Sequence, residues 1–315
     1  MEFKHYSVML HECIEGLAIK PDGIYVDGTA GGAGHSREIA SRLTTGRLIA
    51  IDRDPEAVRT ARERLSGFNA QVVQSNYDEI RGVLDALGID SVDGILLDLG
   101  VSSYQLDNAE RGFSYHNDAP LDMRMSGEGM SARDVVNEYS EAQLADIIFR
   151  YGEEKFSRSI ARGIVKAREQ KPVETTMELA QIIKDNVPQK ARREKNPCKK
   201  TFQAIRIEVN GELVHLSNAL DAAFDCLGVG GRMCVITFHS LEDRLVKQRF
   251  AEYCKGCVCP PDFPVCVCGK TPSGRLISKK PITPTQEELI QNNRSHSAKL
   301  RIIEKLKPRD TEIRV

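Results

Sequence analysis

The residues best suited to chemistry stand in one short turn, IYVDGTAGGAGHS, which covers residues 24–36. Four glycines fall within positions 28–34, after an apolar run and before an amphipathic stretch. A strand, a glycine-rich turn and a helix gather backbone N–H groups at a helix N-terminus, where they suit an anion. The dinucleotide fingerprint G-x-G-x-x-G fails, because Arg37 replaces the last glycine of a pattern from Gly32 and Ala30 breaks one from Gly28. The phosphate-loop pattern also fails, since no Gly-Lys-Ser/Thr follows.

Two carboxylates accompany this turn. Asp27 ends the first apolar run, and Asp52 closes the second, LIAID, 25 residues later (52 − 27). A carboxylate at the second strand end can accept hydrogen bonds from both ribose hydroxyls of an adenosine. NAD enzymes use the same device, so Asp52 indicates an adenosine ribose without naming the cofactor. Its other interpretation is an N-cap for the helix that starts at Pro55, but Asp54 is better placed for that role.

An acidic strand end followed by a turn that is glycine-rich up to Gly34 is the arrangement of class I methyltransferases, where the turn accommodates S-adenosylmethionine. Thr29 and Ala33 depart from this arrangement, because both stand at positions usually held by glycine. The pattern therefore favours a methyltransferase over a pyrophosphate-binding protein.

The elements that position these residues alternate like βαβ units. Apolar runs at 23–28, 47–52, 71–76 and 92–100 are separated by amphipathic stretches at 35–43, 55–65 and 78–87, which predicts a parallel sheet covered on both faces. Residues 104–210 contain no convincing strand and predict helices. Strand-like sequence resumes at 231–238, and 275–280 with 298–306 predicts an antiparallel pair at a sheet edge. We expect an α/β domain of residues 1–103 and 211–315, interrupted by a helical insertion of residues 104–210.

Composition sets broad limits on partners and location. The 44 Lys and Arg against 45 Asp and Glu give a net charge of −1 over 315 residues, which argues neither for nor against nucleic acid. No apolar run approaches the ~20 residues of a membrane span, and the N-terminus lacks the apolar core of a signal peptide, so we expect a cytoplasmic protein. The run KARREKNPCKK (190–200) holds six Lys or Arg against one Glu; it is either a solvated loop or an RNA-contacting surface.

Five of the nine cysteines crowd into CKGCVCPPDFPVCVCGK. Cys257 and Cys259, and Cys266 and Cys268, form two C-x-C pairs around a proline-rich turn, and Cys254 offers an alternative ligand. Four thiolates this close suit a tetrahedral structural zinc. Disulfides or free thiols are the alternative.

Longer strings carry a family resemblance: HYSVMLHECIEGL, IAIDRDPEA, DGILLDLGVSSYQLDNAERGFSYHNDAPLDMRM, TFQAIRIEVNGEL and GGRMCVITFHSLEDRLVK. Together with the glycine turn they resemble the bacterial MraW or RsmH family of 16S ribosomal RNA (cytosine N4) methyltransferases over nearly the whole chain. The resemblance implies a class I, Rossmann-like methyltransferase sheet with an inserted helical RNA-recognition domain. It also implies S-adenosylmethionine-dependent methylation of the exocyclic amine of cytosine 1402 of 16S rRNA in the small ribosomal subunit.

The resemblance also assigns cofactor contacts to residues of this chain. Ala33, Gly34 and His35 would meet the methionine portion, Asp52 the ribose and Tyr77 the adenine, and Asp98 and Gln105 would complete the set. Each has a plainer alternative: His35 could cap its helix, Tyr77 could be a core aromatic, and Asp98 could be a structural carboxylate. Gln105 rests on the resemblance alone.

Cytosine N4 is a poor nucleophile, so an acceptor on its hydrogens would stabilise the positive charge that develops during transfer. We expect Asp98 or nearby backbone carbonyls to supply that acceptor. His239, in FHSLEDR, either lines the base pocket or bonds to Ser240 in its own helix cap. An aromatic ring would help hold a flipped base, and the candidates are Phe113, Tyr115 and Phe238. Competing interpretations are an NAD-dependent oxidoreductase and a non-catalytic RNA-binding scaffold.

Overall fold

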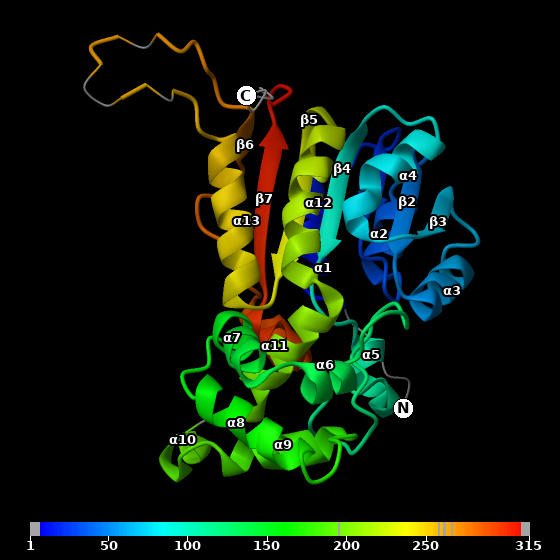
Figure 1. The fold of residues 1–315 in the computed structure, drawn as a ribbon. Helices are drawn as coiled ribbons and strands as arrows, with labels where there is room; N and C mark the ends of the chain where they lie inside the picture. The colour runs from blue at the N-terminus through cyan, green and yellow to red at the C-terminus, as the bar shows by residue number, and fades with distance from the viewer. Residues whose placement is uncertain (1–6, 195, 258, 261–262, 266, 310–315) are drawn as a thin grey trace. The chain divides into compact units, whose positions relative to one another are not determined.

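A computed structural model describes residues 7–194, 196–257, 259–260, 263–265 and 267–309 of the chain. It divides into two compact units (Figure 1): unit 1 combines residues 1–100 with 215–315, and unit 2 is residues 101–214. The sequence placed the boundaries at 103/104 and 210/211, whereas the structure places them at 100/101 and 214/215. The second boundary falls within helix α12 (Glu212–Cys226).

Unit 1 contains a seven-stranded sheet of order β3-β2-β1-β4-β5-β7-β6. Pairing among β1 to β5 is parallel, and β7 pairs antiparallel with both β5 and β6. This order, with one antiparallel strand near the edge, is that of the class I methyltransferase sheet, so the predicted fold is confirmed. The strands are β1 (Ile24–Asp27), β2 (Arg47–Asp52), β3 (Ala70–Gln74), β4 (Val92–Asp98), β5 (Leu227–Thr237), β6 (Gly274–Leu276) and β7 (Lys299–Lys305).

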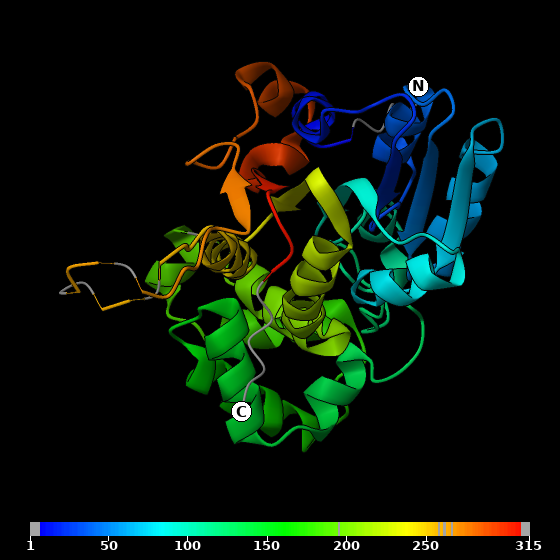
Figure 2. The same cartoon turned by 90° about the horizontal axis from the view of Figure 1, so that it is seen from above.

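Both faces of the sheet are buried, which explains why the strands read as continuous apolar runs. Ile49 and Ile51 of β2 face one core cluster, while Leu48 and Ala50 face the other. The first face is covered by α4 (Ile80–Ala86), α12 and α13 (Ser240–Tyr253), and the second by α1 (Leu10–Leu17), α2 (Gly34–Ser41) and α3 (Pro55–Arg64), as the view along the sheet shows (Figure 2). The described residues of the unit also form the short elements η1 (Tyr77–Glu79), α14 (Gln286–Gln291) and η3 (Asn293–Ser297).

Strand β1 lies between β2 and β4. From β1 the chain adds strands first on one side (β2, β3) and then on the other (β4, β5), so the strand order reverses at β1. Ligands of open α/β sheets bind outside the carboxyl ends of the strands at such a switch point. The glycine turn follows β1, Asp52 ends β2 and Asp98 ends β4. The sheet order therefore brings the residues that the sequence singled out together at the carboxyl ends of the strands.

Unit 2 is helical, with its own apolar core. Ser131, Ser140 and Thr175 each start a helix with a reciprocal capping box, in which the side chain three residues later bonds back to the cap. The basic run 190–200 is not a simple loop, because it includes most of α10 and the start of α11. The elements are α5 (Ser103–Asp107), η2 (Ala109–Arg111), α6 (Ala132–Glu138), α7 (Glu141–Gly152), α8 (Ser157–Arg168), α9 (Thr176–Asp185), α10 (Gln189–Glu194) and α11 (Cys198–Asn210).

None of the helices in the described part of the chain is both long and apolar enough to cross a bilayer.

Candidate active site

The glycine turn is held from inside by Asp27. This carboxylate is almost fully buried; its Oδ1 accepts a hydrogen bond from the backbone N–H of Thr29 (3.1 Å), and its Oδ2 accepts one from the hydroxyl of Ser36 (2.6 Å). The turn is also bonded to its neighbours, since Gly28 N–H donates to Leu96 O and Ala30 N–H donates to Ile51 O. Asp27 therefore shapes the turn, and both of its oxygens are used by the protein.

Two of the glycines lie close to side chains of the protein itself. A Cβ on Gly28 would lie 2.6 Å from Leu97 Cδ2, and one on Gly34 would overlap the Ser7 hydroxyl. Gly31 has a positive φ of 48°, and Ala33, which stands where glycine was expected, has a φ of 60°. The sequence suggested that a ligand approaches this backbone, but at positions 28 and 34 the neighbour is the protein's own chain.

Asp52 joins the second strand end to the turn. Its Oδ2 accepts the N–H of Gly31 (2.8 Å), and its Oδ1 accepts the N–H of Asp54 (2.9 Å). Burial raises the pKa of Asp52 to about 6, against the opposing effect of these two donors. Asp54 is the N-cap of α3 and accepts the N–H of Glu56, as predicted. Each carboxylate oxygen of Asp52 has a second lone pair, so the group can still accept hydrogen bonds from a ligand.

His35 lies in the first turn of α2 and is buried. Its Nε2 is 3.0 Å from the carbonyl oxygen of Val8, which can only accept, so Nε2 carries the proton. Its Nδ1 faces Oδ2 of Asp98 at 3.6 Å. Burial lowers the pKa of His35 to about 4. The contact with Asp98 is therefore not an ion pair at neutral pH: a neutral imidazole presents its lone pair to the carboxyl group. His35 does not cap the helix; that position is occupied by Ala33.

Asp98, at the end of β4, combines a buried carboxylate oxygen that has no hydrogen-bond donor among the described residues with a raised pKa. Its backbone N–H donates to the hydroxyl of Thr29 (2.6 Å). Its Oδ1 is buried and has no hydrogen-bond partner among the described residues, although the side chain as a whole is a quarter exposed. Burial raises the pKa of Asp98 well above its usual value, and the charges of Asp27, Glu242 and Glu288 add to that effect. A buried acceptor without a donor, at the carboxyl end of a central strand, is suited to a donor supplied by a ligand.

The segment around Val8, which bonds to His35, is itself held by a hydrogen bond to Glu288. Oε1 of Glu288, in α14, accepts the N–H of Met9 (2.8 Å), and Met9 has a positive φ of 52°. The preceding carbonyl, that of Val8, is the one that holds His35. Sequence reasoning missed Glu288, because its contact joins residues 279 apart and no local pattern marks it.

Known proteins are similar to this chain over almost its full length. The sequence model of the MraW methylase family matches residues 2–306. The chain belongs to this family. It is 58% identical over 311 residues to the ribosomal RNA small subunit methyltransferase H of Lachnospira eligens, covering 97% of this chain and 99% of that one. It is 56% identical over 309 residues to the protein of the same description from Clostridium botulinum strain Kyoto, covering 97% and 100%. The predicted resemblance is confirmed.

In this MraW-family methylase, His239 forms the N-cap of α13. Its Nδ1 accepts the N–H of Glu242 (3.4 Å), and Oε2 of Glu242 accepts the N–H groups of Phe238 (2.8 Å) and His239 (3.2 Å). The capping alternative is thus partly correct, but the partner is Glu242 and not Ser240. The buried Nε2 of His239 lies 3.1 Å from Oε1 of Glu242 and forms no hydrogen bond with any described residue. A role in the base pocket stays a prediction.

The other two predicted cofactor residues fall in different units. Tyr77 begins η1 directly after β3, is half-buried, and lies beside the glycine turn, because a Cβ on Gly28 would come within 3.2 Å of Tyr77 Cβ. Gln105 lies in unit 2, where it closes the capping box of α5: its Oε1 accepts the N–H of Ser102 (3.0 Å). The structure gives Gln105 a local structural role, and its contact with a cofactor stays a prediction.

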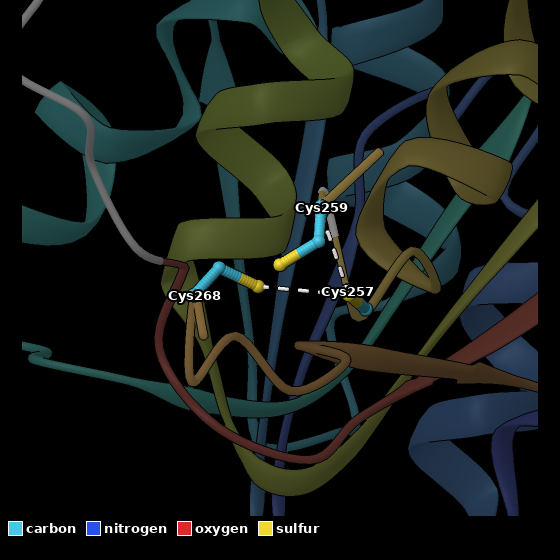
Figure 3. A group of neighbouring side chains, drawn as sticks. All are labelled: Cys257, Cys259 and Cys268. Carbon is cyan, nitrogen blue, oxygen red and sulfur yellow. Dashed lines mark hydrogen bonds between the residues drawn. The ribbon is translucent and has the colours of Figure 1, made fainter. Parts of the chain in front are cut away.

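Three of the predicted metal ligands form a group in unit 1. The sulfur atoms of Cys257, Cys259 and Cys268 all lie within 4.8 Å of one another (Figure 3). Cys254 is not part of the group; it caps the C-terminus of α13 and packs against the core. Cys266 lies outside the described residues.

Proposed function

We propose that this protein is an S-adenosylmethionine-dependent methyltransferase of small-subunit ribosomal RNA, and that it methylates N4 of cytosine 1402 in 16S rRNA. The family and the names of its relatives support an rRNA methylase. The observation that carries the chemical assignment is the donorless, buried Oδ1 of Asp98 at the carboxyl end of β4. Such an oxygen suits an exocyclic amine, which has two hydrogens to donate. A ribosomal substrate would place the protein in the cytoplasm.

The cofactor is assigned to the carboxyl edge of β1, β2 and β4. Asp52 would accept the two ribose hydroxyls through its remaining lone pairs, and Tyr77 would lie along the adenine. The methionine portion would run past Ala33, Gly34 and His35, and Gln105 of unit 2 would add a further contact. When bound, S-adenosylmethionine supplies the electrophilic methyl group on a sulfonium.

Asp98 then has two tasks in the transfer. Its Oδ1 would accept one hydrogen of the cytosine amine, which concentrates the nitrogen lone pair and stabilises the positive charge that develops on N4. It would also fix N4 in line with the methyl carbon and sulfur, and positioning contributes much of such a rate. With S-adenosylmethionine bound, the N4–C bond would form as the methyl–sulfur bond breaks, which would leave a neutral thioether and a cationic amine that would lose a proton to water. No strong base is needed.

His35 would act through Asp98. Because the Val8 carbonyl keeps the imidazole proton on Nε2, the Nδ1 lone pair is always turned to Asp98. This arrangement cannot donate a hydrogen bond to the carboxylate, so the acceptor capacity of Asp98 is left for the substrate. In this role His35 would withhold a donor from Asp98; it would not hold the carboxylate in place, because its lone pair faces the carboxylate oxygen.

The RNA is assigned to unit 2, on the basic segment 190–200. Lys190 and Lys199 of this segment are exposed, whereas Arg192 and Lys200 already bond to the carbonyls of Val187 and Glu153. Phosphate contacts are salt-sensitive. Reversing the charge of Lys190 and Lys199 should weaken rRNA binding at least tenfold and leave S-adenosylhomocysteine affinity unchanged; an equal loss of both affinities would remove this assignment.

The deciding experiment is transfer of a labelled methyl group to small ribosomal subunits that lack the modification, followed by identification of the product nucleoside. Wild-type protein should yield N4-methylcytidine, and Asp98→Ala should reduce the rate at saturating cofactor at least a hundredfold. The matched control is Asp90→Ala, which alters an exposed aspartate before the opposite end of β4. Methylation of any other atom, or full activity of Asp98→Ala, would contradict the proposal.

The cysteine group has no part in this reaction. It follows α13, and the 14 residues of that helix extend for about 21 Å from His239 at its start. A metal held there would be structural.

A further inference from the structure

The segment that follows α13 brings three cysteine sulfur atoms together. Sγ of Cys268 lies 3.8 Å from Sγ of Cys257, and Cys259 lies within 4.8 Å of both. The side chains of Cys259 and Cys268 point toward each other (Figure 3). At 3.8 Å, Cys257 and Cys268 form no disulfide, since a disulfide joins sulfurs at about 2.05 Å; the Cys268 thiol instead donates a hydrogen bond to Sγ of Cys257.

The spacing has a simple chemical meaning. In a tetrahedral zinc site with Zn–S bonds of ~2.3 Å, neighbouring sulfurs are ~3.8 Å apart. That is the distance between Cys257 and Cys268. With one pair of sulfurs at 3.8 Å and all three within 4.8 Å of one another, the group is close enough to gather around one cation.

Backbone N–H groups point at two of these sulfurs. The N–H of Cys259 donates to Sγ of Cys257 (3.4 Å), and the N–H of Val267 donates to Sγ of Cys259 (3.4 Å). Such donors stabilise negative charge on sulfur and orient thiolates toward a metal. All three cysteines are at least partly exposed, so a metal ion can enter. The buried cysteines Cys13 and Cys234 differ, because burial raises the pKa of each thiol and keeps it neutral.

We propose that Cys257, Cys259 and Cys268 bind a structural Zn²⁺ ion. Binding converts the thiols into thiolates and releases their protons to water, with no change of oxidation state. The sequence offers Cys266 for the fourth position, but that residue lies outside the described part of the chain and the proposal rests on the other three. The inference goes beyond the proposed methylation and does not depend on it.

Cys254, the alternative ligand suggested by the sequence, is excluded from the site. It packs against the core at the end of α13, and burial raises the pKa of its thiol. It therefore provides the matched control: a cysteine of the same segment, three residues from Cys257, that should not bind the metal.

The metal would hold in place the long connection between α13 and β6. Between α13, which ends at Tyr253, and β6, which begins at Gly274, the described residues form neither helix nor strand. One ion bound to Cys257, Cys259 and Cys268 would join the start of this connection to its end. The site follows the C-terminal end of α13, a helix about 21 Å long, so its loss should leave the cofactor site intact.

The test measures zinc in full-length protein purified under reducing conditions without chelators. Wild-type protein and Cys254→Ser should each hold about one zinc per chain, and Cys257→Ser and Cys268→Ser should each lose at least tenfold. Replacement of zinc by Co²⁺ should give the intense visible bands of tetrahedral thiolate coordination in wild-type protein. Cys257→His, which keeps a ligand at that position, should retain metal with a shifted cobalt spectrum. Unchanged binding of S-adenosylhomocysteine in every variant shows that unit 1 is folded.

Three results would each overturn the proposal. The first is wild-type protein that binds neither Zn²⁺ nor Co²⁺ after reduction and metal addition, with its thiols all titratable or joined as disulfides. The second is full zinc retention in both Cys257→Ser and Cys268→Ser. The third is loss of zinc from Cys254→Ser equal to the loss from Cys257→Ser. None of them depends on methyl transfer, so failure of the zinc site is distinguishable from failure of the proposed function.

Discussion

Replacing Asp52 by asparagine should change how the stability of the ligand-free protein depends on pH. Burial raises the pKa of Asp52 to about 6 from an ordinary value of 3.8. The folded state therefore holds a proton on Asp52 between these two pH values, where the unfolded state has lost it. It follows that Asp52 makes the wild-type protein more stable as pH falls from above 6 toward 4. The asparagine side chain of the Asp52→Asn variant cannot titrate, so the substitution removes this contribution.

The magnitude follows from the two pKa values. At pH 8 both states are ionised and Asp52 contributes no pH dependence. At pH 5 Asp52 is mostly protonated in the folded state and mostly ionised in the unfolded state, which shifts the folding equilibrium toward the folded state about tenfold. Tenfold corresponds to ~1.4 kcal/mol, and the partial exposure of the side chain reduces this to about 1 kcal/mol. The asparagine also loses one acceptor for a backbone N–H, but that cost is the same at both pH values and cancels in the comparison.

The assay is urea unfolding of wild-type protein and Asp52→Asn at pH 5 and pH 8, followed by circular dichroism without cofactor. The stability of Asp52→Asn relative to wild type should be about 1 kcal/mol more favourable at pH 8 than at pH 5. Asp90→Asn, which alters an exposed carboxylate, is the control and should show no such change. A difference between Asp52→Asn and wild type that is the same at both pH values would refute the reasoning, because it would mean that Asp52 titrates normally.

Two further predictions concern the same edge of the sheet. Burial lowers the pKa of His35 from 6.5 to about 4, so as pH falls through this range the unfolded state binds a proton before the folded state does, and stability falls. Between pH 7 and pH 5, the free energy of unfolding of His35→Gln, measured with urea, should therefore fall by about 2 kcal/mol less than that of wild type. An equal fall in both proteins would contradict a buried neutral imidazole. A Cβ on Gly28 would lie 2.6 Å from Leu97 and press toward Tyr77, so Gly28→Ala should cost about 1–3 kcal/mol and weaken S-adenosylhomocysteine binding measured by calorimetry. Gly67→Ala, where nothing lies within 4 Å of an added Cβ, should change neither quantity.

The sequence predicted most of the fold because the relevant signals are local. Strands buried on both faces read as apolar runs, and helix starts carry their own caps, as Asp54 does for α3. The edge that gathers Asp52 and Asp98 follows from the order of parallel strands. What stayed hidden depends on contacts between distant segments: the bond from Met9 to Glu288 joins residues near the two ends of the chain, and no periodicity indicates it.

The glycine turn shows a second limit. From the sequence, a glycine indicates only that something lies close to the backbone, not what it is. At Gly28 and Gly34 the neighbours are Leu97 and Ser7, which belong to the protein. Similarly, the charge of residues 190–200 allowed either a solvated loop or an RNA-contacting surface. Its helical form depends on packing within unit 2, as the burial of Cys198 shows.

The charges at this edge explain why it suits a sulfonium better than a pyrophosphate. Burial raises the pKa values of Asp27, Asp52 and Asp98, so each carboxylate is ionised at a cost when no cation is near. The imidazole beside them, His35, is neutral and cannot offset that charge. A dinucleotide would add a doubly negative group to this acidic edge, whereas a sulfonium would bring the missing positive charge and favour the ionised form of Asp98, which is the better acceptor for an amine. After transfer the sulfur of the product, S-adenosylhomocysteine, is a neutral thioether and no longer offsets the charge of the carboxylates. The electrostatics that favour binding of the methyl donor therefore favour binding of the product less.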